Sequence, residues 1–276
     1  MRVEHTSRYR YRSEVRSSYN EARMTAMTTP EQQTIESNLS VEPRCRPFRY
    51  TDYWGTVVHA FDLHAPHAEL RVDAVAVVET GDTRPVEATL GWDDLAGPKV
   101  RDSLGEYLEA TAYVPDDSGV AELAAELRAG GGPAAAVEAA AGWVSDNVSY
   151  AKGATKVSTS CTEVFDRRVG VCQDYAHLTL GVLRAMGIPA RYVSGYLHPR
   201  PDAVPGDSVV GESHAWVEAW LGPWHGLDPT HAGLAGARHV LVARGRDYAD
   251  VPPLKGVYRG GQAEDLEVSV VVTRLS

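Results

Sequence analysis

Three residues of this chain have the side chains of a thiol nucleophile and its activating partners: Cys172, His214 and Asp228. A thiol reacts as the thiolate, so it needs a base beside it, and the base needs a carboxylate or amide that fixes its tautomer. The chain offers these parts in that order. The three residues therefore predict a Cys-His-Asp triad, provided that the fold brings them together.

The segment that begins at Cys172 is predicted to be a buried helix. Apolar residues recur there at the helical intervals of three and four: Ala176, Leu180, Leu183 and Met186. Gly187 ends the helix, and Pro189 prevents it from resuming. Cys172 would then lie in the first turn, where free backbone N–H groups and the positive end of the helix dipole stabilise a thiolate.

Two other residues compete for the same roles. Cys161 is also expected at a helix start, because Ser160 and Glu163 have the spacing of a capping box. The dipole argument cannot choose between the two cysteines, but a long buried helix follows Cys172 and only a short one follows Cys161. His177 is a rival base. It lies five residues along the helix, so its side chain points roughly 140° away from that of Cys172.

A strand is predicted to begin at His214, because polar and apolar residues alternate from there. After a Gly-Pro turn, residues 224–227 can run back beside it and bring Asp228 near the level of His214. If both strands pack against the helix, the three side chains can converge. An Asp before a proline is also common at turns, and Glu218 or Asp247 are the alternative acceptors for the histidine.

The elements around these segments divide the chain in two. Residues 1–115 contain short alternating segments punctuated by prolines, which predicts a β-sandwich-like domain. Composition changes near 114–118, and residues 116–276 form the second predicted domain, with strands at its C-terminal end. Helices and strands are expected within it at 120–129, 133–146, 190–197 and, as two strands, within 251–275.

The composition disfavours several classes of partner. The 276 residues carry a formal net charge of -10, which disfavours nucleic acid or an anionic membrane as the main partner. No apolar run has the length of a transmembrane helix, and the polar, basic start of the chain shows no signal peptide. Three scattered cysteines make no disulfide framework, so we expect a cytoplasmic protein.

No metal or other cofactor is predicted from the motifs. His64 and His67 share a loop around a proline, but no HExxH or CxxC motif follows them. Both are therefore expected to be surface histidines. The sequence also lacks the acidic loop of an EF-hand, which would bind calcium.

Several motifs in a fixed order resemble the transglutaminase-like superfamily in its bacterial form. They span about 158–253 and are Ser158–Phe165, Gly170–Leu178, Gly195-Tyr196, Ser213–Glu218, Leu227–Thr230 and Gly245–Pro253. The N-terminal region resembles the β-rich domain that often precedes this core, with a weaker motif at Tyr53-Trp54-Gly55. The order of the motifs makes the resemblance specific.

The resemblance implies an α+β fold with a papain-like transglutaminase core, in which the cysteine-bearing helix packs on an antiparallel sheet. Carried over to the matching positions, Cys172 is the nucleophile, His214 the base and Asp228 the orienting carboxylate. The backbone N–H of Cys172 is one expected oxyanion donor, and the second is unassigned. Cys161 departs from the family, which usually has a small apolar residue there.

On this resemblance, the chain is a cysteine-dependent enzyme acting on amide or isopeptide bonds of a protein or peptide through an acyl-thioester. The triad does not distinguish hydrolysis from acyl transfer to an amine, because both pass through the same acyl-enzyme. The alternative is a non-catalytic binding or scaffold protein, since some relatives have lost the triad. The presence of all three residues weighs against it. The substrate, the oligomeric state and the role of the N-terminal domain stay open.

Overall fold

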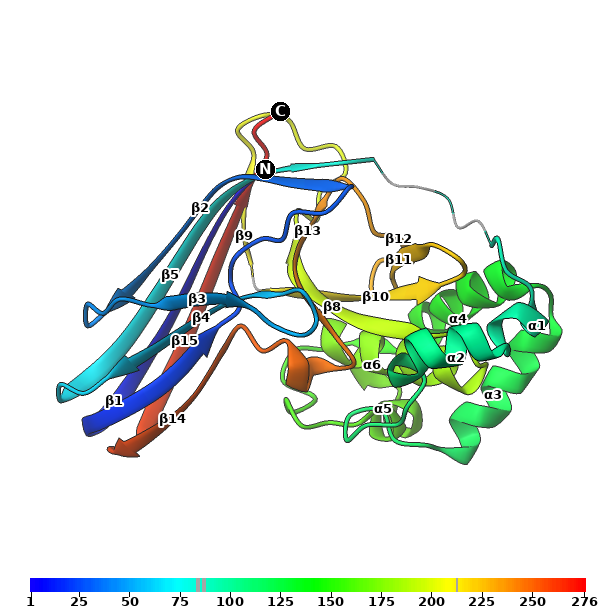
Figure 1. The fold of residues 1–276 in the computed structure, drawn as a ribbon, viewed down its shortest axis with the longest axis horizontal. Helices are drawn as coiled ribbons and strands as arrows, with labels where there is room; N and C mark the ends of the chain where they lie inside the picture. Colours follow the sequence, from blue (N-terminus) through cyan, green and yellow to red (C-terminus); the bar gives the residue numbers. More distant parts are fainter. Residues whose placement is uncertain (83–84, 86–87, 212) are drawn as a thin grey trace.

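The computed structural model describes residues 1–82, 85, 88–211 and 213–276. Long strands form one curled antiparallel sheet on one side of the molecule, and helices pack on a second antiparallel sheet on the other (Figure 1). This arrangement confirms the predicted α+β class. Both ends of the chain lie at the same end of the large sheet (Figure 1).

The large sheet is organised around its longest strand, β1 (Arg2–Ala22). Over the described residues it has eight strands, the others being β2 (Gln32–Glu42), β3 (Phe48–Thr51), β4 (Val57–Leu63), β5 (His67–Thr80), β9 (Ser208–Gly211), β14 (Leu254–Gly260) and β15 (Ala263–Thr273). The first half of β1 pairs with β5 and β15, and its second half pairs with β4 and β14. The β-sandwich-like domain thus takes the form of one curled sheet rather than two stacked ones.

The smaller sheet contains the two strands predicted beside the cysteine helix. Over the described residues it has five antiparallel strands, in the order β12 (Gly233–Leu234), β11 (Trp224–Asp228), β10 (His214–Trp220), β8 (Ala190–Leu197) and β13 (His239–Gly245). The strands predicted at 190–197, from His214 onward and at 224–227 are confirmed. A short parallel pair precedes the cysteine helix and consists of β6 (Ser149–Tyr150) and β7 (Val169–Gly170).

Helix α6 (Cys172–Ala185) is the centre of this core, and every residue from Asp174 to Arg184 is buried. The other helices are α1 (Trp92–Leu95), α2 (Pro98–Leu104), α3 (Ser118–Ala129), α4 (Pro133–Asn147) and α5 (Cys161–Arg167), with short 3-10 turns η1 (Gly105–Tyr107) and η2 (Tyr248–Asp250). Helices α3, α4 and α5 pack on α6, which also contacts β8 and β10 (Figure 1). In the described ranges, no helix has the length and apolar character needed to cross a membrane.

Hydrogen bonds join the two halves of the sequence. Strands β9, β14 and β15 come late in the chain, yet they belong to the large sheet. Strands β14 and β15 pair with β1, and β9 pairs with β15. Val270 and Val272 of β15 are buried in the same apolar cluster as the residues of α6. Strands from the C-terminal part of the chain therefore complete the sheet that the N-terminal part begins. The domain division between residues 115 and 116 stays a prediction.

Candidate active site

The start of α6 is built by the residues just before and after Cys172. The Asp174 carboxylate accepts the Val171 N–H at 2.7 Å and the Thr155 hydroxyl at 2.6 Å, which ties the incoming chain to the helix. Gly170 is required there, because a Cβ on it would lie 2.5 Å from the Cβ of Asp174. Cys172 is therefore held as the first residue of the helix, half-buried and facing a cavity.

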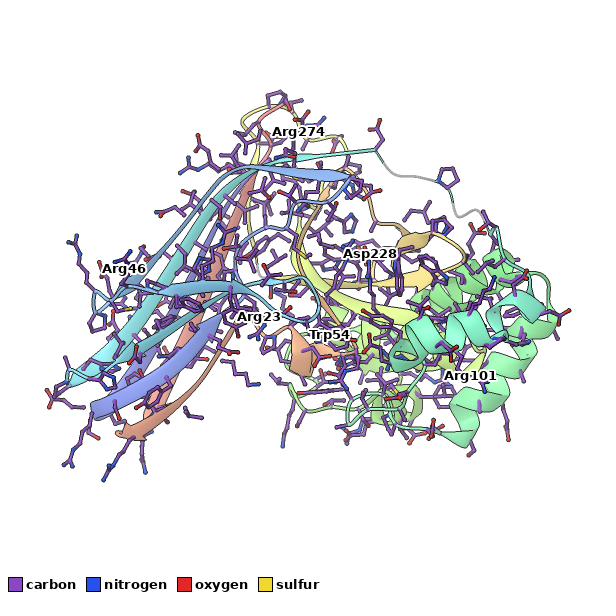
Figure 2. All side chains as sticks on the ribbon, in the orientation of Figure 1. Arg23, Arg46, Trp54, Arg101, Asp228 and Arg274 are labelled. Carbon is purple, nitrogen blue, oxygen red and sulfur yellow. The ribbon has the colours of Figure 1, made fainter. Side chains whose placement is uncertain are left out.

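His214 and Asp228 are brought together by two neighbouring strands. His214 begins β10 and Asp228 ends β11, and these strands pair antiparallel. The His214 Nε2–H donates to Asp228 Oδ2 at 2.8 Å, and both side chains are buried. The other Asp228 oxygen accepts the Thr230 N–H at 3.0 Å, so the carboxylate has a fixed orientation. Asp228 lies in the interior, near the middle of the view in Figure 2.

His214 also forms a hydrogen bond with Cys172. Because Asp228 occupies Nε2, the remaining ring nitrogen, Nδ1, is the one left for the thiol. Burial opposes a charged imidazole, but the hydrogen bonds to Asp228 and to Cys172 outweigh it and raise the pKa of His214 from 6.5 to about 9. A ring with that pKa holds a proton readily after taking it from a thiol. The structure thus brings together all three residues predicted for the site.

Two further histidines, neither of which was predicted to belong to the site, also donate hydrogen bonds to Asp228. The His231 Nδ1–H donates to Asp228 Oδ2 at 2.9 Å and the His239 Nε2–H donates at 3.1 Å. The Gly236 N–H donates to Nδ1 of His239, which leaves the proton of that ring on the nitrogen facing Asp228. Burial would raise the pKa of Asp228, but hydrogen bonds from the three imidazoles hold it well below its usual range.

Of these two histidines, only His231 has a signal in the sequence. His231 follows Asp228 by three residues, a spacing that keeps it close after a strand end. His239 begins β13, at the far edge of the five-stranded order from β11, and only the folded sheet brings it to the same carboxylate. A local pattern cannot predict that contact.

The two rivals identified in the sequence have other surroundings. Cys161 is fully buried at the start of α5, and burial raises its pKa to about 11. His177 is also fully buried, which lowers its pKa to about 3, and its Nε2 accepts the Tyr248 N–H at 3.2 Å. Cys161 has no solvent access and therefore cannot attack a substrate. His177 stays neutral and packs in the core rather than acting as a base.

The alternative acceptors for His214 are engaged elsewhere. Glu218 is buried between Arg191 at 2.6 Å and Arg244 at 2.9 Å, which together hold its pKa below the usual value despite burial. The Asp247 carboxylate accepts the Ala249 N–H at 2.8 Å and thereby caps the turn η2. Asp228 is thus the acceptor that contacts the histidine.

Two cavities meet at Cys172 and His214. The larger has a volume of about 630 Å³ and is lined by aromatic and small polar side chains and by one stretch of β15, namely Tyr150, Tyr192, Ser194, Ser213, Tyr248 and residues 265–268. The smaller, of about 200 Å³, is mostly apolar, with Leu197, Pro199, Val209, Val210, Val270 and Val272 in its walls. A bound substrate can therefore extend to either side of the thiol.

One group of side chains could ligate a metal ion. Ligand atoms of His214, Asp228 and His239 lie within 4.8 Å of one another. The same atoms are joined by the hydrogen bonds to Asp228 Oδ2, so an ion would have to displace those protons.

His64 and His67 were expected on the surface. His64 is exposed and bonded to Asp62, whereas His67 is buried and bonded to a backbone carbonyl.

Comparison with known proteins agrees with this geometry. The Transglutaminase-like superfamily model matches residues 121–229, and the Bacterial transglutaminase-like N-terminal region matches residues 1–79. An uncharacterized protein from Mycobacterium leprae is 47% identical over 276 residues, covering 100% of this chain and 99% of that protein. The chain belongs to the transglutaminase-like superfamily.

Two further proteins resemble parts of this chain or its fold. A protein-glutamine gamma-glutamyltransferase of Pseudomonas aeruginosa is 37% identical over 108 residues, which cover 35% of this chain and 16% of that protein. The solved structure of a candidate cysteine protease from Cytophaga hutchinsonii shares the fold, with a TM-score of 0.75 and 24% identity over 98% of this chain and 90% of its own. The solved structure supports the fold, and the family match together with the transferase supports a cysteine-type enzyme in general terms.

Proposed function

We propose that this protein is a cysteine-dependent enzyme that cleaves amide or isopeptide bonds of a protein or peptide through an acyl-thioester at Cys172. The observation that carries the proposal is the hydrogen-bonded row Cys172–His214–Asp228, which ends in a thiol where two cavities meet. The non-catalytic alternative gives no reason for a reactive thiol, a base and a carboxylate to be aligned at a cavity.

The first half-reaction forms the thioester. His214 Nδ1 takes the thiol proton of Cys172, and the thiolate sulfur attacks the carbonyl carbon of the substrate amide. Asp228 stabilises the imidazolium that results, because its pKa is held low and it stays ionised. When the tetrahedral intermediate collapses, the C–N bond breaks and His214 returns the proton to the leaving amine.

The negative oxygen of the intermediate needs hydrogen-bond donors. The backbone N–H of Cys172 is one, since the first N–H groups of a helix have no partner within it. We propose the Tyr192 hydroxyl as the second, because this residue of β8 lines the larger cavity beside Cys172. Burial and the nearby Cys172 raise the pKa of Tyr192 well above 10, so its hydroxyl stays protonated and can donate.

The second half-reaction resolves the thioester. Either water or a primary amine attacks the acyl carbon, while His214 Nδ1 takes a proton from the attacking group and the sulfur leaves as the thiolate. The two outcomes share every residue of the row. They differ in whether an amine or water reaches the thioester first. An experiment must therefore distinguish acyl transfer from hydrolysis.

The proposal is tested by incubating purified protein with glutamine-containing peptides, with and without a primary amine, and following the products by mass spectrometry. Incorporation of the amine identifies an acyltransferase, and peptide cleavage or release of ammonia identifies a hydrolase. The Cys172→Ala variant serves as the inactive control. Cys161→Ala is the matched control, because it removes the other cysteine that begins a helix. Absence of every product across peptides with the wild-type protein would refute the proposal.

A further inference from the structure

One stretch of the large sheet has a free edge beside the thiol. Strand β15 pairs with β1 along one edge, from Ala263 to Thr273. On its other edge, the described residues pair with it only at Val270–Thr273, through the short strand β9. Residues 265–268 therefore have an edge without a strand partner among the described residues. The same four residues line the larger cavity that contains Cys172.

The backbone groups on this edge face away from β1. The Arg274 N–H donates to the Asp207 carbonyl at 2.9 Å, and the Arg274 carbonyl accepts the Gly206 N–H at 2.8 Å, so both groups of Arg274 face the β9 side. Figure 2 labels Arg274 at the end of the sheet where the two termini meet. In a regular antiparallel strand every second residue repeats that direction. The register is regular back to Asp265, so Leu266 and Val268 turn their N–H and C=O groups to the open edge.

The pairing of β1 with β5 and β15 gives the same direction for the backbone groups of Leu266 and Val268. The Val78 N–H donates to the Met1 carbonyl at 2.8 Å, so the odd-numbered residues of β1 face β5 and the even-numbered ones face β15. Arg2 pairs with Thr273, which makes the odd-numbered residues of β15 the ones bonded to β1. The even-numbered Leu266 and Val268 are left facing outward.

The side chains beside this edge are apolar. Leu266 and Val268 share a face with the buried Val270 and Val272, yet they are 47% and 38% exposed. On the other face, Asp265 and Glu267 make ion pairs with Arg10 at 3.9 and 3.5 Å. Four consecutive residues of a strand line one cavity only when the cavity meets the strand edge, because successive side chains point to opposite faces.

We infer that this edge binds an extended segment of the peptide substrate as an added strand. The inference rests on the proposed function and names the kind of substrate. A row of outward N–H and C=O groups is satisfied by another peptide backbone, and the exposed Leu266 and Val268 favour an apolar side chain on that segment. Because the cavity continues to Cys172, a peptide paired here reaches the thiol. The large sheet then holds the substrate while the core carries the chemistry.

The test removes one outward donor. Val268→Pro has no backbone N–H, and proline is tolerated at an outward-facing position of an edge strand. Val268→Ala is the matched control, which shortens the side chain but keeps the N–H. The probes are an extended glutamine peptide with apolar neighbours and a blocked single glutamine. Val268→Pro should lower kcat/KM for the peptide about threefold to tenfold through KM, which corresponds to the loss of one hydrogen bond. The blocked glutamine is too short to pair with this edge, so its kcat/KM should fall less than that of the peptide.

A second measurement uses the wild-type protein alone and decides the matter if the proline variant does not fold. Peptides N-methylated at successive positions should lose turnover at every second residue of the paired segment, because alternate N–H groups face the partner strand. Uniform turnover of the methylated peptides, or a Val268→Pro variant with unchanged kcat/KM, would overturn the inference and leave the proposed function standing. A wild type that turns over neither probe would overturn both.

Discussion

Two cysteines begin helices in this chain, and they differ in burial, in access to a cavity and in their hydrogen-bond partners. Cys172 begins α6, lines both cavities and hydrogen-bonds His214. Cys161 begins α5, is fully buried, and packs with its sulfur 3.9 Å from the Pro115 carbonyl. Burial raises the pKa of Cys161 to about 11. A helix start therefore yields a nucleophile only where the thiol also has a base and access to the substrate.

The largest expected effect comes from exchanging the two cysteines for alanine in turn. Cys172→Ala should lower turnover at least about ten-thousand-fold, because the thioester can no longer form. Cys161→Ala should keep most of the activity and lose about 1–2 kcal/mol of stability from the small cavity in the core. Turnover and melting temperature of both purified variants check this. Loss of activity only in Cys161→Ala would move the nucleophile to α5.

The partners of Cys172 should show graded effects. His214→Ala removes the base and should be nearly inactive. Asp228→Ala should lose about a hundredfold to a thousandfold, and Asp228→Asn less, since an amide oxygen still accepts from the ring. Asp228 also accepts from His231 and His239, so its variants are compared with the wild type at a temperature where melting curves show them folded. A folded Asp228→Ala with wild-type turnover would remove Asp228 from the mechanism.

A smaller effect is expected at Tyr192. Tyr192→Phe removes the proposed oxyanion donor but keeps the ring that packs near His177 and Tyr248. We expect kcat to fall about tenfold to a hundredfold. The alkylation rate of Cys172 should stay unchanged, because that reaction forms no oxyanion. An equal fall in both rates would indicate that the phenol only supports the local structure.

The smallest expected effect is a shift in pH dependence. With a pKa of about 9, His214 is charged below that pH and neutral above it, so the alkylation rate of Cys172 should change near pH 9 as the imidazolium partner is lost. Asp228→Asn removes the negative charge that favours the imidazolium, and this upper transition should move to lower pH. Rates measured from pH 5 to pH 10.5, at roughly half-unit steps around the expected pKa, would show it. An identical profile in both proteins would argue against a charged pair.

What could be predicted from the sequence was local. The helix that begins at Cys172 follows from apolar spacing, and the strands that carry His214 and Asp228 follow from alternation and a Gly-Pro turn. Each of these signals lies within a few residues of the side chain that it positions. The convergence of the three side chains was then expected on the condition that both strands pack against the helix.

The remainder depended on contacts between distant segments. His239 meets Asp228 only because β13 joins the core sheet beyond β8. The cavity wall at 265–268 comes from a strand that pairs with the first residues of the chain, and no spacing near Cys172 indicates it. The exposed edge of β15 is likewise a property of the whole sheet. The catalytic roles and the cytoplasmic location stay predictions.

The whole mechanism depends on the proposal that Cys172, and not Cys161, is the reactive thiol. Its most direct test is site-resolved labelling of the folded wild-type protein with iodoacetamide near neutral pH, followed by peptide mapping of all three cysteines. We expect rapid, selective labelling at Cys172, slow labelling at the half-buried Cys45 and almost none at Cys161. Labelling of Cys172 no faster than that of Cys45, or faster labelling of Cys161, would contradict it.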